Sequence, residues 1–287
     1  MNAGTGPDRR RIVTCHQPTY LPWGGLFHKL HLADLLVVMD TVGYSSKGWQ
    51  NRTRIKGPQG AVRLVVPLAA RTRTAPLRDI EIAAGGAPPS RDWQHRHWRS
   101  LHVCYARAPY WHRYSPVFEE IYLGRRWLRL ADLNLALLDA MIELFGIGVT
   151  RVRASEIGET GRKSRLIQDY CQRTSAAVYI SGINGYDYLI EDEFAAGDIS
   201  VFYQSYRSAA YPQRFGEFVS DLSAVDLLFN LGAEAAAHTM FAGNVSRAAL
   251  LAELDRYGAP AVLDTVPYAG GGQVRARAPR RREVCAA

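Results

Sequence analysis

The sequence predicts an α/β fold: a Rossmann-like, mainly parallel sheet with a helical insert or cap. Two observations predict it. Short apolar runs rich in β-branched residues alternate with helical patterns near both ends of the chain, as repeated βαβ units require. The middle of the chain, residues 93–147, shows only the helical period, over three successive stretches. We therefore expect two halves of one α/β domain separated by a helical insert.

The first half, residues 11–92, opens with a predicted βαβ unit. The runs 11–16 ("RIVTCH") and 34–40 ("DLLVVMD") have the length and composition of buried strands. The stretch 24–33 between them is predicted to be a short helix, because it follows Pro22 and two glycines and is helical in pattern. The crossover between the two strands should be right-handed.

A basic segment follows, in which residues 61–69 are predicted to be a third strand and residues 76–83 an edge strand. Residues 44–57 are too polar for a buried strand and are predicted to be a loop. No acidic residue occurs from Thr41 to Arg78, so the segment should attract anions; the alternative is a solvated basic face. The eight basic residues of the segment are Lys47, Arg52, Arg54, Lys56, Arg63, Arg71, Arg73 and Arg78.

The second half, residues 148–235, returns to short strands. Beyond it, residues 236–268 are expected to be a helical extension, and the ends 1–10 and 269–287 are expected to be disordered. The predicted elements of the second half are strands at 150–155, 177–182 and 199–206 and helices at 161–174 and 222–232, the last with Gly232 as its C-cap.

The composition indicates the cellular compartment and the classes of partner that are expected. The net charge of +8 comes mostly from arginines at the two ends, so a nucleic acid is not the expected partner. The chain has no apolar run long enough to span a membrane and no secretion signal. Its four cysteines show no CxxC spacing, which favours reduced thiols and a cytoplasmic protein.

The loop after the first predicted strand is the first candidate site. His16 ends that strand and Asp40 ends the second, so both should lie on the rim where open α/β sheets bind ligands. Gly25 opens the following helix, where a phosphate would meet free N–H groups. The alternatives are a structural histidine, a rigid prolyl turn and a tryptophan in the core. The other candidates of this stretch are Gln17, Tyr20, Trp23, His28 and Lys29.

The segment 44–57 is expected to share that site around one anionic ligand. Arg52 and Arg54 can each bind a phosphate or carboxylate with two parallel hydrogen bonds. The alternative is a surface loop whose arginines contact only solvent. The other candidates of the segment are Tyr44 and Trp49 for stacking, Gln50 and Asn51 for an amide or sugar hydroxyl, and Lys56 for charge.

Metal and serine chemistry are not predicted. His28 and His31 are three residues apart on the expected helix, but no cysteine or carboxylate nearby completes a zinc pattern. No GxSxG motif occurs, so Ser181 and Gly182 are expected to mark a ligand-facing loop at a strand end rather than a nucleophile.

The motifs "HQPTYLPWGGLFHK", "DTVGYSSKGWQNRTRIKG", "RHWRSLHVCYARAPYW", "YISGINGYDYL" and "SAVDLLFNLG" resemble the WbqC-like family over about residues 11–235. The resemblance implies a setting in O-antigen, other surface-polysaccharide or natural-product biosynthesis; residues beyond about 235 extend past it. The positions carried over by motif are His16, Gln17, Pro18, Tyr20, Pro22, Trp23, His28, Lys29, Tyr44, Ser45, Trp49, Gln50, Asn51, Arg52, Lys56, His97, Trp98, Ser181, Gly182, Tyr188, Asp226, Phe229 and Asn230.

A second likeness concerns mechanism. The opening of the chain is similar to nucleotidylyltransferases and pantothenate-synthetase-like ligases, which hold ATP phosphates with a HxGH-type motif. This chain has "WGGLFHK" instead, with His28 and Lys29 one turn late. The likeness implies ATP and Mg²⁺ as cofactors.

The predicted function is an enzyme, a transferase or ligase, that activates a small (amino) acid with a nucleotide and transfers the acyl group to an amine of a sugar or related acceptor. His16 would be a general base or phosphate ligand, Lys29 and Arg52 would stabilise negative charge, and Asp40 or Asp226 would deprotonate the amine or hold Mg²⁺. The alternatives are a transferase that uses a pre-activated, phosphate-bearing donor and a non-catalytic glycan-binding component.

Overall fold

The fold is that of a computed structural model, which describes residues 10–72, 74–84, 92–266 and 272–279. A seven-stranded sheet forms its centre, in the order β5-β2-β1-β6-β7-β8-β9. Neighbouring strands are parallel except β8 and β9. The mainly parallel α/β fold is therefore confirmed. The strands are β1 (Ile12–His16), β2 (Leu35–Val38), β5 (Thr150–Arg153), β6 (Val178–Gly182), β7 (Ser200–Gln204), β8 (Val262–Val266) and β9 (Gln273–Arg277).

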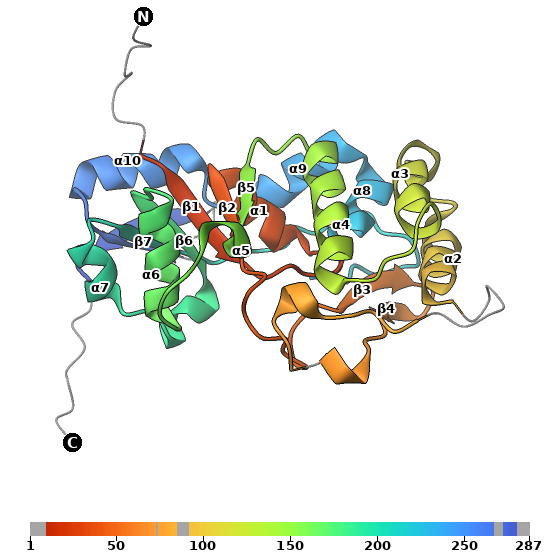
Figure 1. Cartoon of the computed structure of the whole chain (residues 1–287). Helices are drawn as coiled ribbons and strands as arrows, with labels where there is room; N and C mark the ends of the chain where they lie inside the picture. The colour runs from red at the N-terminus through yellow and green to blue at the C-terminus, as the bar shows by residue number, and fades with distance from the viewer. Residues whose placement is uncertain (1–9, 73, 85–91, 267–271, 280–287) are drawn as a thin grey trace, which may run out of the picture.

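Helices cover both faces of this sheet, as a parallel sheet requires. Because side chains alternate along a strand, Ile12 of β1 packs toward α10 (Arg247–Tyr257) and Val13 packs toward α6 (Ser164–Arg173). Figure 1 shows α6 in front of the sheet and α10 along its upper end. The inner strands β1, β2, β6 and β7 are buried on both sides, which explains their largely apolar sequences.

The strand order is that of the Rossmann fold. Read in the order in which the strands occur along the chain, the first six lie 3-2-1-4-5-6 across the sheet. Helix α1 (Gly24–Leu32) connects β1 to β2, as the sequence predicts. The order reverses between β1 and β6, and in such sheets the crevice outside the carboxyl ends of these two strands is the usual ligand site.

A helical part packs beside the sheet and shares the largest apolar core (Figure 1). Phe27 of α1 lies in that core, which joins the two parts of the molecule. Of these helices, α2, α3, α4 and α8 fall where the sequence predicts them, and Gly232 is the C-cap of α8. They are α2 (Trp93–Tyr105), α3 (Trp111–Leu123), α4 (Leu130–Leu144), α8 (Ala224–Leu231) and α9 (Ala233–Phe241). The remaining helical pieces are α5 (Ala154–Ile157), α7 (Glu191–Ala196) and the single turns Ala70–Thr72, Leu77–Asp79 and Ile183–Asp187.

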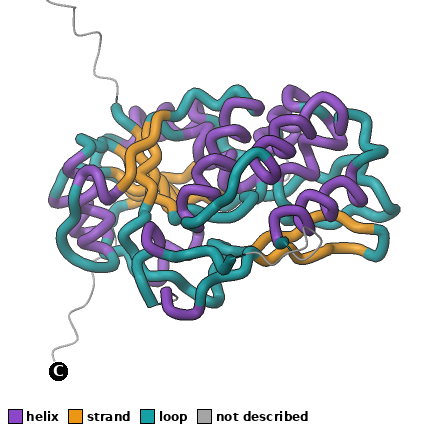
Figure 2. Tube along the Cα trace, turned by 45° about the vertical axis from the view of Figure 1, so that its right-hand side comes forward, coloured by secondary structure: helices purple, strands orange, loops and turns teal. Residues whose placement is uncertain are grey.

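The basic segment differs from expectation. Residues predicted to form a loop include strand β3 (Arg52–Gly57), which pairs antiparallel with β4 (Gly60–Val65) in a separate two-stranded sheet. Figure 2 shows this hairpin apart from the central sheet. The strand forms because Thr53 and Ile55 point into the core while basic side chains alternate with them on the other face. Residues 76–83 contain a helical turn and two isolated bridges rather than an edge strand.

The C-terminal part also differs. The predicted helical extension contains strand β8, and strand β9 lies within the tail expected to be disordered. The guanidinium of Arg277 explains the order of β9: its nitrogens lie 2.8 Å from both carboxylate oxygens of Glu191 and 2.9 Å from Asp264 Oδ2. Residues 1–9 and 280–287, also expected to be disordered, lie outside the described residues. Within the described part, no helix is long and apolar enough to cross a membrane.

Candidate functional site

Lys29 and His16 meet at the carboxyl end of β1, on the crevice between β1 and β6. The side chain of Lys29 reaches from α1, and its Nζ lies 3.3 Å from both Cys15 O and His16 Nδ1. Lys29 is only 5% exposed. Among the described residues no carboxylate lies within ion-pair distance of Nζ. The crevice therefore holds a buried ammonium whose acceptors are uncharged.

The environment of the pair sets its protonation. Burial lowers the pKa of Lys29 to about 8. Burial, and then the charge of Lys29, lower the pKa of His16 well below 6.5. Near neutral pH Lys29 is thus charged and donates to Nδ1 of a neutral imidazole. The proton of that imidazole is then on Nε2, which has no hydrogen-bond partner in the described part of the chain. His16 is half-buried, not sealed in the core.

The end of β6 forms the other side of the crevice. Thr14 pairs with Ile180, so the register places Gly182 level with His16. Ser181 is buried and donates its hydroxyl to Gly182 O at 3.0 Å. A Cβ on Gly185 would lie 2.0 Å from Ser181 Oγ, so the turn after the strand needs glycine there. Tyr188 follows this turn and is 37% exposed.

The two loops predicted to share the site do meet. Gln50 Nε2 donates to Gln17 Oε1 at 2.5 Å. The amide of Asn134, on α4, donates to Pro18 O at 3.1 Å and to Gln50 O at 2.8 Å. Asn134 was not predicted from the sequence, although an asparagine within the apolar run "LNLALL" is the signal that marks it. Tyr44 and Asn51 hold the second loop, since Tyr44 OH donates to Asn51 Oδ1 at 3.1 Å.

The arginines of that segment lie elsewhere on the hairpin. Arg52 donates to Ser46 O, and Arg54 donates to Asp221 O at 3.2 Å. Within the described residues neither guanidinium forms a hydrogen bond with the crevice pair. Lys56 is 2% exposed and donates to Glu217 O. The expectation that Arg52 and Lys56 bind the same ligand as His16 therefore finds no contact to support it.

Both predicted catalytic aspartates have structural partners. Asp40 is fully buried, and its oxygens accept from the N–H of Ser155 at 3.0 Å and from its hydroxyl at 2.7 Å, which holds the first turn of α5. Asp226 is also fully buried. Its carboxylate accepts from the hydroxyls of Tyr105 and Tyr211 at 2.8 Å and from the amide of Asn230 at 3.2 Å, and burial raises its pKa.

Each oxygen of the two carboxylates thus accepts a hydrogen bond from the protein, which gives Asp40, Asp226 and Asn230 structural contacts that the sequence did not indicate. No group of three or more His, Cys, Asp or Glu side chains in the described residues is placed to hold a metal ion.

Two predicted binding histidines belong to the core. His28 Nε2 lies 2.9 Å from Val245 O, and its Nδ1 lies 2.7 Å from Gln204 Nε2. His97 Nδ1 lies 2.7 Å from the hydroxyl of Tyr20. Burial lowers the pKa of each histidine to about 4, so both are neutral. Tyr20, His28 and His97, all predicted to contact a substrate, therefore make contacts within the fold.

The glycines at the start of α1 make room for side chains, not for a ligand. A Cβ on Gly25 would lie 2.5 Å from the indole of Trp23, and one on Gly24 would lie 2.7 Å from the hydroxyl of Tyr206. Trp23 and Tyr206 meet edge to face with ring centres 5.2 Å apart, and Trp23 remains 40% exposed. Phosphate binding at this helix N-terminus therefore has no open approach to Gly24 or Gly25.

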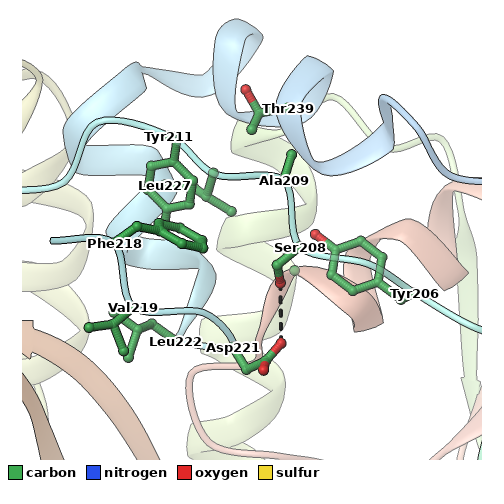
Figure 3. Close-up of a pocket in the computed structure, with 11 residues that line it drawn as sticks. Tyr206, Ser208, Ala209, Tyr211, Phe218, Val219, Asp221, Leu222, Leu227 and Thr239 are labelled. Carbon is green, nitrogen blue, oxygen red and sulfur yellow. Dashed lines mark hydrogen bonds between the residues drawn. The ribbon is translucent and has the colours of Figure 1, made fainter. Parts of the chain in front are cut away.

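A small cavity lies next to this aromatic pair, under the long loop between β7 and α8. Figure 3 shows its lining, with Tyr206, Phe218 and Leu227 around the space and Ser208 bonded to Asp221 at 3.2 Å. It contains neither Lys29 nor His16.

The two loops of the site, α1 and the central strands β2, β5, β6 and β7 fall in one family region. Residues 17–238 match the model of the WbqC-like protein family. The chain belongs to this family. Over 227 residues it is 31% identical to the uncharacterized protein Rv1507c of Mycobacterium tuberculosis. This alignment covers 78% of this chain and 95% of that relative. No solved structure matches the chain. The WbqC-like region begins one residue after His16, contains the other crevice residues, among them Lys29 and Ser181, and ends before α10, β8 and β9.

Proposed function

We propose that this WbqC-like protein is a transferase of surface-polysaccharide or natural-product biosynthesis. It binds a phosphate-bearing, already activated acyl donor between β1 and β6 and transfers the acyl group to an amine of a sugar or related acceptor. The observation that carries the proposal is the buried ammonium of Lys29, which has no carboxylate partner in the described residues and lies 3.3 Å from His16 Nδ1.

The energetics of Lys29 favour an anionic ligand. An ammonium removed from water without a counter-ion costs several kcal/mol, and its neighbours Cys15 O and His16 Nδ1 supply hydrogen bonds but no charge. A phosphate in the crevice would neutralise it and accept the Nε2–H of His16. The crevice is also where folds with this strand order bind their ligands.

The proposed reaction is an acyl transfer in which negative charge develops on the phosphate leaving group. The amine nitrogen of the acceptor attacks the acyl carbon, a C–N bond forms, the C–O bond to phosphate breaks, and the amine proton leaves to solvent. Negative charge grows on the departing phosphate oxygen. Lys29 and His16 would stabilise that charge through fixed donors in a site of low dielectric constant.

A pre-activated donor fits better than activation by ATP within this site. The Gly24 and Gly25 positions at the start of α1 are covered by Tyr206 and Trp23. The oxygens of Asp40 and Asp226, the carboxylates predicted to hold Mg²⁺, already accept hydrogen bonds from the protein. Production of AMP or ADP during turnover would favour the ATP route instead.

The test uses acetyl phosphate as the donor probe and glucosamine as the acceptor probe. Thermal shift with acetyl phosphate should stabilise the wild type, and mass spectrometry should detect the N-acetylated amine above the uncatalysed background. Lys29→Met should lose both signals. Lys47→Met, which removes an exposed lysine of the second loop, is the matched control and should keep both. Retention of donor binding by Lys29→Met would overturn the proposal.

A non-catalytic glycan-binding role is the second candidate. Trp23 and Trp49 are 40% and 48% exposed, and Tyr188 is 37% exposed; all three lie in loops of the site. Exposed aromatic rings suit sugar faces. In this case glycans would bind without product and His16→Gln would bind them as well as the wild type does, whereas the transferase should lose turnover in that variant.

A further inference from the structure

A cluster on the hairpin combines three arginines with one tryptophan. Arg54 pairs with Arg63 across the two strands, so both side chains lie on one face, and Arg52 lies on the same face two residues earlier. The preceding loop folds back over this face, because Arg52 donates to Ser46 O and the guanidinium of Arg54 lies 5.7 Å from the ring centre of Trp49. We call Trp49, Arg52, Arg54 and Arg63 the hairpin cluster.

The charge of the hairpin cluster is not balanced by acids. In the described part of the chain, none of its three arginines forms an ion pair with a carboxylate. The Nε atoms of Arg52 and Arg54 are buried and have no acceptor, so only the terminal guanidinium nitrogens can reach a ligand. Other arginines are used differently: Arg151 and Arg153 are each paired with an aspartate of α4. The positive charge of the hairpin cluster is therefore open to an external anion through terminal guanidinium nitrogens.

The aromatic member of the cluster is held in place yet exposed. Trp49 is 48% exposed, whereas Trp93 and Trp111 are 2% and 4% exposed. The cation–π contact with Arg54 orients the indole without burying it. An oriented, exposed indole is suited to stack on a sugar face or a nucleobase.

We propose that the hairpin cluster is a second binding surface, separate from the crevice, for a ring that carries a phosphate or carboxylate. The ring stacks on Trp49, and the anionic group accepts paired hydrogen bonds from Arg54 and Arg52. The surface is connected to the crevice through the Gln17–Gln50 hydrogen bond. Its role does not depend on the proposed acyl transfer.

Isothermal titration with the full-length protein tests this surface. The probes are uridine monophosphate and glucose 1-phosphate, with uridine, glucose and inorganic phosphate as the separate halves. Each combined ligand that uses the surface should bind at least tenfold more tightly than either of its halves. Tighter binding of uridine monophosphate would identify a nucleotide as the source of the ring, and tighter binding of glucose 1-phosphate would identify a sugar phosphate.

Substitutions in the hairpin cluster test which side chains bind the ligand. Trp49→Ala and Arg54→Met should each weaken binding at least tenfold. Arg113→Met is the matched control, because Arg113 also stacks on a ring, that of the buried Tyr114, at 5.5 Å, and it should change nothing. Arg54→Lys keeps the charge but loses the paired donors, and it should weaken binding even if Arg54→Met does not fold.

Lys29→Met removes the phosphate site proposed for the crevice and should still bind each combined probe at least tenfold more tightly than its halves. Loss of binding of the combined probes in Lys29→Met, or unchanged binding when Trp49→Ala is added to Lys29→Met, would overturn the proposal. Equal affinities of Lys29→Met for inorganic phosphate and the combined ligands would overturn it as well.

Discussion

Nζ of Lys29 lies 3.3 Å from Nδ1 of His16, at the point where the strand order of the sheet reverses. The contact joins a residue of α1 to the last residue of β1, so the charge of the Lys29 amine affects the pKa of the His16 imidazole. It also makes the site testable by pH, since the two groups titrate far from their ordinary ranges.

Lys29→Met should change the pH dependence of stability. Burial lowers the pKa of Lys29 from 10.5 to about 8, so between these values the unfolded chain holds a proton that the folded protein has released. The free energy of unfolding of the wild type should therefore gain on the order of 3 kcal/mol relative to the variant as pH rises from 8 to 10.5. Urea denaturation at several pH values measures this, and parallel curves would contradict the buried charge.

Anion binding in the crevice should weaken as pH rises. The charged form of Lys29 is lost above about pH 8, so affinity should fall up to tenfold per pH unit beyond that point. Sulfate is the appropriate probe, because its own charge is constant in this range. Titrations from pH 6.5 to 9.5 should show the decline in the wild type and a weak, flat response in Lys29→Met. An affinity that rose with pH would mean that neutral Lys29 is the binding form.

The two neighbouring histidines should separate stability from function. His28→Leu removes the partners of Val245 O and Gln204 Nε2 and should cost about 2 kcal/mol of stability. His16→Leu removes one of the two acceptors of the buried Lys29 ammonium and should cost a similar amount, about 2 kcal/mol. Denaturant titration combined with the donor-binding assay measures both effects. Donor binding should be lost only in His16→Leu.

Arg277→Met should destabilise the protein through β9. The guanidinium joins Glu191 and Asp264, and removal of one partner from a largely buried ion-pair group costs about 3 kcal/mol. Arg275→Met is the matched control on the same strand, because Arg275 is exposed and forms no ion pair within the described residues. Equal stability of the two variants in thermal melts would show that β9 does not anchor the sheet.

The central strands could be predicted from the sequence because buried parallel strands are continuous apolar runs. Strand β3 could not, since Arg52, Arg54 and Lys56 hide the inward alternation of Thr53 and Ile55. Strand β9 was missed as well: an arginine-rich tail resembles a disordered one, and Glu191, the acid that orders Arg277, is far away along the chain.

The candidate site, too, could be predicted from the sequence only in part. His16, Lys29 and the meeting of the two loops followed from strand ends and local motifs. No sequence pattern indicates that His28 faces Gln204 and Val245, or that Trp23 fills the space beside Gly25, because both contacts depend on distant or folded-back side chains.

Strands β8 and β9 lie beyond the WbqC-like region yet are hydrogen-bonded onto β7 in one continuous sheet. In a shortened protein that stopped at residue 238, the backbone groups of β7 that pair with β8 would lose their hydrogen-bond partners. The exposed edge of β7 would then favour self-association. Expression of the family region alone should therefore yield aggregates, and work on this protein should retain its residues through Arg277.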